Sequence, residues 1–313
     1  MIGLLIGGVL GLVLSAAGTP LFIRFLVKRG YGQFVRDDGP TTHKTKRGTP
    51  TMGGAVIIGS MVLAYLITHG LLAVLGVDFG GPTASGLILL LLTVGMAFVG
   101  FVDDFTKITK QRSLGLTPRG KIILQALIGT AFAVLALNFP DERGLTPAST
   151  AISFARDVPW LDLAFAGPAI GVILFVIWSN LITTATTNAV NLTDGLDGLA
   201  TGATAMITGA YVLMSLFQSS QSCALEGTRG CYEVRDPMDL ALLAAILTGS
   251  LLGFLWWNTS PAKIFMGDTG SLGLGGALAG FAIFTRTEIL VAVLAGLMVA
   301  ITLSVIIQVG WFK

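Results

Sequence analysis

Nine apolar runs of about 20 residues constrain this sequence more than any other feature, because an apolar helix of that length spans a membrane. A membrane β-barrel would instead need short segments of alternating hydrophobicity. Hydrophobic residues make up 53% of the 313 residues, and charged residues only 12%. We therefore predict an all-α integral membrane protein, a polytopic helical bundle that forms one domain over residues 1–313. The predicted spans are residues 2–27, 53–75, 84–102, 120–138, 160–182, 198–218, 239–257, 269–285 and 289–309.

Lysine and arginine residues gather on one side of the predicted bundle. Fourteen of the 19 lie on the side of the loops at 28–52 and 103–119, and five lie on the other side. Because basic residues near span ends stay in the cytoplasm, we predict that these loops are cytoplasmic and that the N-terminus lies outside. The charges of the first span follow its apolar run, so it is not a cleavable signal peptide. The sequence predicts a multi-pass membrane protein.

The acidic residues on the predicted cytoplasmic side are all aspartates, and five of them lie where a span meets a loop. An ionised Asp at the bilayer centre costs at least ~2.5 kcal/mol, so carboxylates here must be solvated or compensated. Their clustering at one membrane face suggests a shared site. These residues are Asp37, Asp38, Asp103, Asp104, Asp194, Asp197 and Asp268.

The segment FVDDFTKITK ends the third span with two adjacent aspartates, Asp103 and Asp104. In a helix Lys107 lies four and three residues further on, so the three side chains can converge. Adjacent carboxylates repel each other, and a site that keeps both ionised needs a cation such as Mg²⁺. The alternative is a helix-end pair that faces water.

Two further segments bring polar side chains and glycines together. NAVNLTDGLDGLA contains Asn188, Asn191, Asp194 and Asp197, which can bind ribose hydroxyls, a base edge or a metal; the alternative is a turn with Asx caps. NTSPAKIFMGDTGSLGLGG places Asp268 before a helix start, which is either an anion or metal site or a simple helix cap. In the same segment Phe265 can stack on a base or anchor the membrane interface.

These segments together place carboxylates for Mg²⁺, lysines for phosphate oxygens and glycine-lined turns at one membrane face. Phosphoryl transfer needs a metal, positive charge and an aligned nucleophile, and little covalent chemistry from the protein. The membrane setting implies that one reactant is a lipid.

The segments KRGTPTMGG, DDFTKITK, NAVNLTDGLDGLA and FMGDTGSLGLGG resemble, in order and spacing, the phospho-N-acetylmuramoyl-pentapeptide-transferases of the polyprenyl-phosphate N-acetylhexosamine-1-phosphate transferase superfamily. The resemblance covers residues 43–276, and TPTMGG is similar to this family instead of relatives that use UDP-N-acetylglucosamine. It implies transfer of phospho-MurNAc-pentapeptide from UDP-MurNAc-pentapeptide to undecaprenyl phosphate, giving lipid I and UMP in peptidoglycan synthesis. It also implies Mg²⁺ as the cofactor and a homodimer in the lipid bilayer of the bacterial inner membrane.

The resemblance also implies roles for single residues. Asp103 and Asp104 match the catalytic pair, and Asp268 matches a catalytic carboxylate that binds Mg²⁺. Either Asp103 deprotonates the lipid phosphate for direct attack, which we favour, or a carboxylate forms a covalent phosphosugar intermediate. The residues expected at the diphosphate are Lys46, Lys107, Lys121, Asn188, Asp194 and Asn258. Those expected to hold uridine are Gly195, Leu196, Asp197 and Phe265.

One departure from the family concerns the end of the chain. The family has ten spans and a His-rich loop before the last, whereas this sequence predicts nine spans, and neither His43 nor His69 lies in an equivalent loop. We therefore expect the last cytoplasmic loop and the tenth span to be missing here.

Two other functions are retained as alternatives. One is a sibling transferase that moves GlcNAc-1-phosphate from UDP-GlcNAc to polyprenyl phosphate. The other is a secondary transporter, which would place its aspartates near the membrane midplane instead of at one face.

Cys223 and Cys231, the two cysteines of the chain, both lie in the predicted outer loop between the sixth and seventh spans. Thiols on the oxidising side of a membrane form disulfides readily, and the short segment between them contains glycines that permit a turn. We predict that they form a disulfide; the alternative is two unpaired thiols.

Overall fold

A computed structural model describes residues 1–31, 48–77, 79–111, 114–223 and 231–312 of the protein. Seven helices in these ranges are long and apolar enough to cross a membrane. The prediction of a polytopic helical membrane protein is therefore confirmed.

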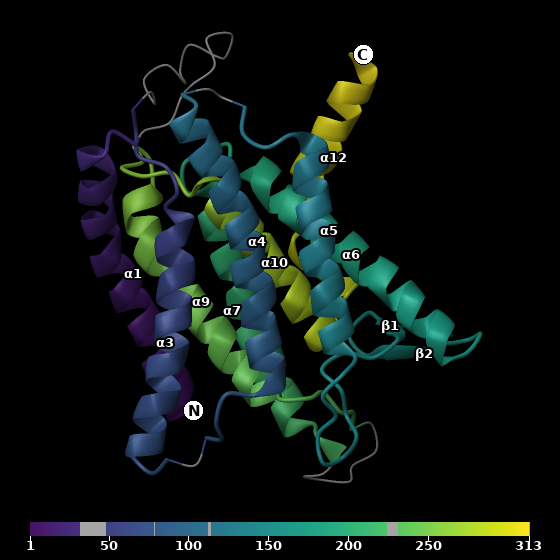
Figure 1. The fold of residues 1–313 in the computed structure, drawn as a ribbon. Helices are drawn as coiled ribbons and strands as arrows, with labels where there is room; N and C mark the ends of the chain where they lie inside the picture. Colours follow the sequence, from purple (N-terminus) through teal and green to yellow (C-terminus); the bar gives the residue numbers. More distant parts are fainter. Residues whose placement is uncertain (32–47, 78, 112–113, 224–230, 313) are drawn as a thin grey trace.

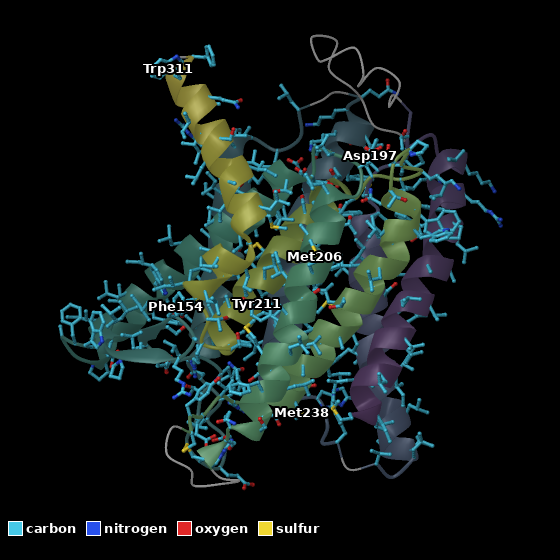
Figure 2. All side chains as sticks on the ribbon, turned by 180° about the vertical axis from the view of Figure 1, so that it is seen from behind. Phe154, Asp197, Met206, Tyr211, Met238 and Trp311 are labelled. Atoms are coloured by element: carbon cyan, nitrogen blue, oxygen red, sulfur yellow. A yellow bond between two sulfur atoms is a disulfide. The ribbon has the colours of Figure 1, made fainter. Side chains whose placement is uncertain are left out.

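The long helices stand side by side as a bundle (Figure 1). They are α1 (Ile2–Lys28), α3 (Gly54–Val74), α4 (Ala84–Thr109), α5 (Pro118–Ala136), α6 (Pro168–Thr193), α7 (Leu199–Ser220), α9 (Pro237–Asn258) and α10 (Gly267–Phe284). The chain finishes with α11 (Leu290–Leu294) and α12 (Gly296–Trp311). We call the end of the bundle where α4 and α6 finish and α10 begins the site end, and the opposite end the far end. Figure 2 shows Asp197 at the site end and Met238 at the far end.

Two of the nine predicted spans differ from the seven long apolar helices. The span predicted at 269–285 forms α10, in which six of 18 residues are glycine, and these residues lower its hydropathy. The span predicted at 289–309 is broken at Ala295 into α11 and α12. Both segments are helical, but α10 is less apolar, and α11 and α12 are each shorter, than the seven helices that can cross a membrane.

The span predicted at 160–182 starts later than expected. Residues 157–162 form strand β2 (Asp157–Asp162), which pairs antiparallel with β1 (Ala151–Ser153). The helix begins only at Pro168, whose fixed φ suits the first helical position. The sequence analysis predicts no strand in this region and so misses this hairpin.

Helix α10 lies at the centre of the bundle and positions the site. Its residues from Thr269 to Phe284 are all buried, and it packs against α3, α4 and α6. Small residues let these helices approach closely: a Cβ added at Gly100 of α4 would collide with the backbone of Asp268 and Thr269. The last turns of α4 and the first turn of α10 are therefore in direct contact.

A buried polar cluster joins α3, α4 and α9 at the far end. The carboxylate of Asp239 accepts hydrogen bonds from the Tyr65 hydroxyl at 2.7 Å and from the Thr83 hydroxyl at 2.6 Å. The Nε2 atom of His69 lies 3.0 Å from its other oxygen. Thr83 is also the N-cap of α4, so this cluster fixes the point at which α4 begins.

Cys223 and Cys231 are joined by a disulfide at the far end, between α7 and α9, with their Cα atoms 5.1 Å apart. The bridge closes a short loop, so by chain-entropy arithmetic it stabilises the protein by at most about 2 to 3 kcal/mol. It lies at the end of the bundle opposite to the carboxylates, and the helices pack independently of it.

We expect the double variant Cys223→Ser, Cys231→Ser to keep the wild-type rate of the transfer that the resemblance implies, because the bridge lies at the end of the bundle opposite to the carboxylates. In unreduced membranes the wild-type thiols should resist a membrane-impermeant maleimide until a reductant is added. Prompt labelling of both thiols without reductant would contradict the bridge.

Candidate active site

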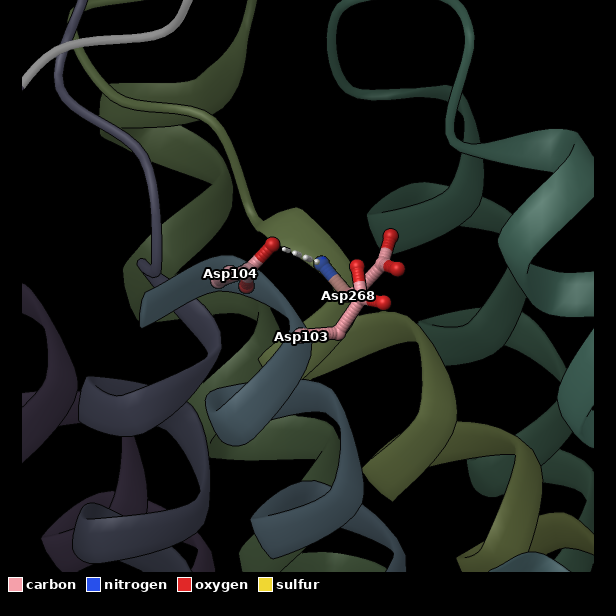
Figure 3. Close-up of side chains that lie close together, drawn as sticks. All are labelled: Asp103, Asp104 and Asp268. Carbon is pink, nitrogen blue, oxygen red and sulfur yellow. Dashed lines mark hydrogen bonds between the residues drawn. The ribbon is translucent and has the colours of Figure 1, made fainter. Parts of the chain in front are cut away.

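At the site end, the last turns of α4 and α6 and the first turns of α5 and α10 bring polar side chains together. Three aspartates lie closest together there, Asp103 and Asp104 from α4 and Asp268 from α10 (Figure 3). Carboxylate oxygens from all three lie within 4.8 Å of one another. Because 164 residues separate Asp104 from Asp268 in sequence, the packing of α4 on α10 creates this cluster.

Asp268 lies in the first turn of α10, and each of its oxygens has partners. The Lys121 ammonium lies 2.7 Å from Oδ2, and the Lys107 ammonium lies 3.1 Å from the same oxygen. The Asn191 side-chain amide donates to Oδ1 at 2.8 Å and to the hydroxyl of Ser271 at 2.8 Å. Helices α4, α5 and α6 therefore each contribute one side chain that orients this carboxylate.

Asp103 and Asp104 are both buried, with 3% of their surface exposed, and both lie near Lys107, at 2.6 and 3.8 Å, but their backbone hydrogen-bond donors differ. Asp103 accepts a hydrogen bond from the backbone amide of Leu116 at 2.8 Å and pairs with Lys107 at 2.6 Å. Asp104 accepts from the backbone amides of Asp268 at 3.2 Å and Thr269 at 2.9 Å. Figure 3 marks the bond between Asp104 and the amide of Asp268.

Asp194 and Asp197 lie in the turn between α6 and α7. Burial raises the pKa of the Asp194 carboxyl well above its usual range, and the carboxylates of Asp268 and Asp104 raise it further. Asp197 accepts a hydrogen bond from the backbone amide of Ala262 at 3.2 Å, so it ties this turn to the connection between α9 and α10. The segment NAVNLTDGLDGLA thus lies beside the aspartate cluster.

Of the other residues expected to bind substrate, Asn258 and Asn188 bond to the protein itself, and Leu196 and Gly195 are exposed. The side chain of Asn258, 2% exposed, accepts from Thr201 at 2.7 Å and donates to the carbonyl of Ile264 at 3.0 Å, so it orders the α9–α10 connection. Asn188 donates to the carbonyl of Thr184 in its own helix. Leu196 is 62% exposed, and Gly195 beside it is exposed as well.

Two predicted residues remain to be placed. Phe265 is half-buried, and its backbone joins residues 50 and 53 through hydrogen bonds of 2.8 and 2.9 Å. It therefore connects the TPTMGG segment to α10. Lys46 lies outside the described residues.

Sequence reasoning missed three residues that shape this site: Leu116, Thr269 and Ser271. Ser271 lies three residues after Asp268 and hence on the same helix face, a spacing that could have identified it. Leu116 contributes a backbone amide, which residue type does not reveal, and Thr269 contributes both its amide and its hydroxyl.

The charges of the described cluster suit a divalent cation. When ionised, the three clustered carboxylates of Asp103, Asp104 and Asp268 are balanced by two lysine ammonium groups, which leaves one excess negative charge. Hard oxygen ligands of this kind favour Mg²⁺. The lysines would then be available to phosphate oxygens of a substrate.

Comparisons with known proteins agree with this chemistry. Residues 86–286 match the model of glycosyl transferase family 4, and residues 46–58 match phospho-N-acetylmuramoyl-pentapeptide-transferase signature 1. The chain is 99% identical over its full length to the phospho-N-acetylmuramoyl-pentapeptide-transferase of Micrococcus luteus and covers 84% of that protein. It is 66% identical to the enzymes of that name from Pseudarthrobacter chlorophenolicus and Renibacterium salmoninarum, of which it covers 85% and 86%. The chain therefore belongs to the phospho-N-acetylmuramoyl-pentapeptide-transferases, within glycosyl transferase family 4.

Proposed function

We propose that this chain transfers phospho-MurNAc-pentapeptide from UDP-MurNAc-pentapeptide to undecaprenyl phosphate, giving lipid I and UMP for peptidoglycan synthesis. The observation that carries the proposal is the convergence of Asp103, Asp268, Lys107 and Lys121 at one end of a membrane bundle. A secondary transporter would instead have its ionisable groups near the middle of the membrane spans.

Asp268, with Asp103 beside it, would hold Mg²⁺ through carboxylate oxygens. When bound, the ion supplies positive charge to the diphosphate oxygens. Asn191 keeps the Asp268 carboxylate in its orientation, and Lys107 and Lys121 bind phosphate oxygens. Gly195, Leu196, Asp197 and Phe265 hold uridine, and Asn188, Asp194 and Lys46 line the diphosphate.

Asp103 accepts a proton from the phosphate of the lipid, and an oxygen of that phosphate attacks the sugar-bearing phosphorus. A new phosphorus–oxygen bond forms to the lipid phosphate, the bond to the uridine-bearing phosphate breaks, and UMP leaves. The lysine ammonium groups stabilise the charge on the departing phosphate. Asp103 lies beside these groups, since its Oδ2 atom is 2.6 Å from Lys107, which also contacts Asp268.

The orientation and assembly of the protein belong to the same proposal. The site end faces the cytoplasm, where the soluble nucleotide is available, and the N-terminus lies outside, as the distribution of lysine and arginine indicates. The protein acts as a homodimer, as the family resemblance implies.

A product assay tests the proposal. Purified protein in detergent, supplied with Mg²⁺ and undecaprenyl phosphate, should convert radiolabelled UDP-MurNAc-pentapeptide into UMP and a product that partitions into organic solvent. UDP-GlcNAc in its place should give no such product. Lipid-linked product from UDP-GlcNAc alone would contradict the proposed substrate and would favour the sibling transferase.

A further inference from the structure

We infer that Asp104 is a positioning residue that holds the first turn of α10, and with it Asp268, while Asp103 alone of the adjacent pair faces the reactants. This inference rests on the proposed function, because it divides the work of one site between two neighbouring carboxylates. It assigns to Asp104 a role different from the catalytic one that the family resemblance implies.

The oxygens of Asp104 are occupied by α10. The backbone amide of Asp268 donates to Oδ1 at 3.2 Å, and the backbone amide and hydroxyl of Thr269 donate to Oδ2 at 2.9 and 2.7 Å. A carboxylate offers about four acceptor positions, so three of them are already used by one helix turn. Asp103 is equally buried, so the two carboxylates differ in their hydrogen-bond partners and not in their exposure.

Helix α10 needs this partner because its own sequence does not supply one. The first N–H groups of a helix have no acceptor within the helix, and Met266 at the N-cap provides no side-chain bond. Asp104 fills that role from α4, and its negative charge also suits the positive end of the α10 dipole.

The α10 side of Asp104 is tightly packed. Gly267 has φ +73°, and a Cβ added there would lie 2.7 Å from Oδ2 of Asp104 and 2.9 Å from the hydroxyl of Thr51. There is therefore no space for a substrate atom between Asp104 and the start of α10.

Asp103 has a different environment, although it is the next residue. Consecutive residues of a helix do not share a face, so their carboxylates point to different neighbours. One oxygen of Asp103 accepts from the amide of Leu116, and the other lies 2.6 Å from the Lys107 ammonium, which in turn contacts Asp268 at 3.1 Å. Asp103 therefore belongs to the group of charges that would meet the substrate.

Hydrogen exchange measured by mass spectrometry separates the two roles, since each carboxylate binds different backbone amides. In the enzyme without metal or nucleotide, Asp104→Asn should speed exchange about tenfold in the peptide that contains Asp268 and Thr269, and should leave the peptide with Leu116 unchanged. Asp103→Asn is the matched control and should give the reverse pattern. Unchanged exchange at Asp268 and Thr269 in Asp104→Asn would overturn the inference.

The transfer rates of Asp104 and Thr269 variants test the same inference through enzyme activity. Asp104→Asn should lower the transfer rate by about 10- to 100-fold, as loss of a residue that orients a ligand typically does. Thr269→Val should also lower the transfer rate, whereas Thr269→Ser, which keeps the hydroxyl, should have the wild-type rate. The double variant Asp104→Asn, Thr269→Val should be no slower than Asp104→Asn alone. Additive losses would show that Asp104 acts on the reactants directly.

The two measurements also separate this inference from the proposed function. If the wild type yields no lipid-linked product, the proposed function fails, whereas the exchange pattern still reports whether Asp104 holds α10. If the wild type is active and the exchange pattern is absent, only the positioning role fails.

Discussion

Replacing Asp268 by Asn should abolish nearly all transfer, with a loss of about 10³-fold in rate. The substitution keeps the shape of the side chain but removes the charge that two lysines contact at 2.7 and 3.1 Å and that would hold Mg²⁺. Excess Mg²⁺ should rescue little, because the missing charge belongs to the ligand. Release of UMP by the purified variant, measured across a range of Mg²⁺ concentrations, provides the test.

The control for this variant is Asp162→Asn, which makes the same chemical change in strand β2, remote from the site. Asp162 accepts hydrogen bonds from Thr150 and Ala164, and an Asn carbonyl can still accept one. Its transfer rate should equal that of the wild type. Wild-type rates for Asp268→Asn as well would reduce Asp268 to a structural residue in the first turn of α10.

Replacing Gly100 by Ala should lower transfer by about 10²-fold without touching any polar side chain, because a displacement of about 1 Å at reacting groups can have that effect. The added Cβ would collide with the carbonyl of Asp268 and the amide of Thr269, which are backbone atoms and cannot rotate away. The start of α10 must therefore move, and Asp268 moves with it. The transfer rate and the thermal unfolding temperature of the purified variant should both fall.

Gly59→Ala is the matched control for this prediction. Gly59 also lies within a bundle helix, but a Cβ added there meets no atom within 4 Å. This variant should keep the wild-type rate, and its stability should stay equal or rise slightly, since Ala favours helix. If Gly100→Ala also keeps the wild-type rate, α4 and α10 pack less tightly than the structure indicates.

The parts of the site that could be predicted from sequence are those set by local helix geometry. Lys107 and Asp103 are four residues apart, and the structure pairs them at 2.6 Å as that spacing predicts. Long apolar runs predict most of the helix positions in the same way, because each run alone satisfies the membrane. The break at Ala295 and the hairpin before Pro168 have no comparable signal.

The parts that sequence could not predict depend on contacts between distant segments. Lys121 meets Asp268 across 147 residues, and nothing in the spacing of either motif indicates this contact. Asn258 is a second example: the family resemblance places it at the diphosphate, and the fold adds that its side chain bonds to Thr201 and Ile264. Residue type gives the chemistry that a side chain can perform, and only the fold determines which partner it has.

The far-end cluster around Asp239 has a mechanical consequence for catalysis. It anchors Thr83 at the start of α4, while α10 anchors Asp104 near the end of the same helix. A helix that is fixed at both ends cannot tilt freely, so α4 holds Asp103 and Asp104 in a constant position relative to α10. Substitutions that release Thr83 from Asp239 should therefore also disturb the positions of Asp103 and Asp104.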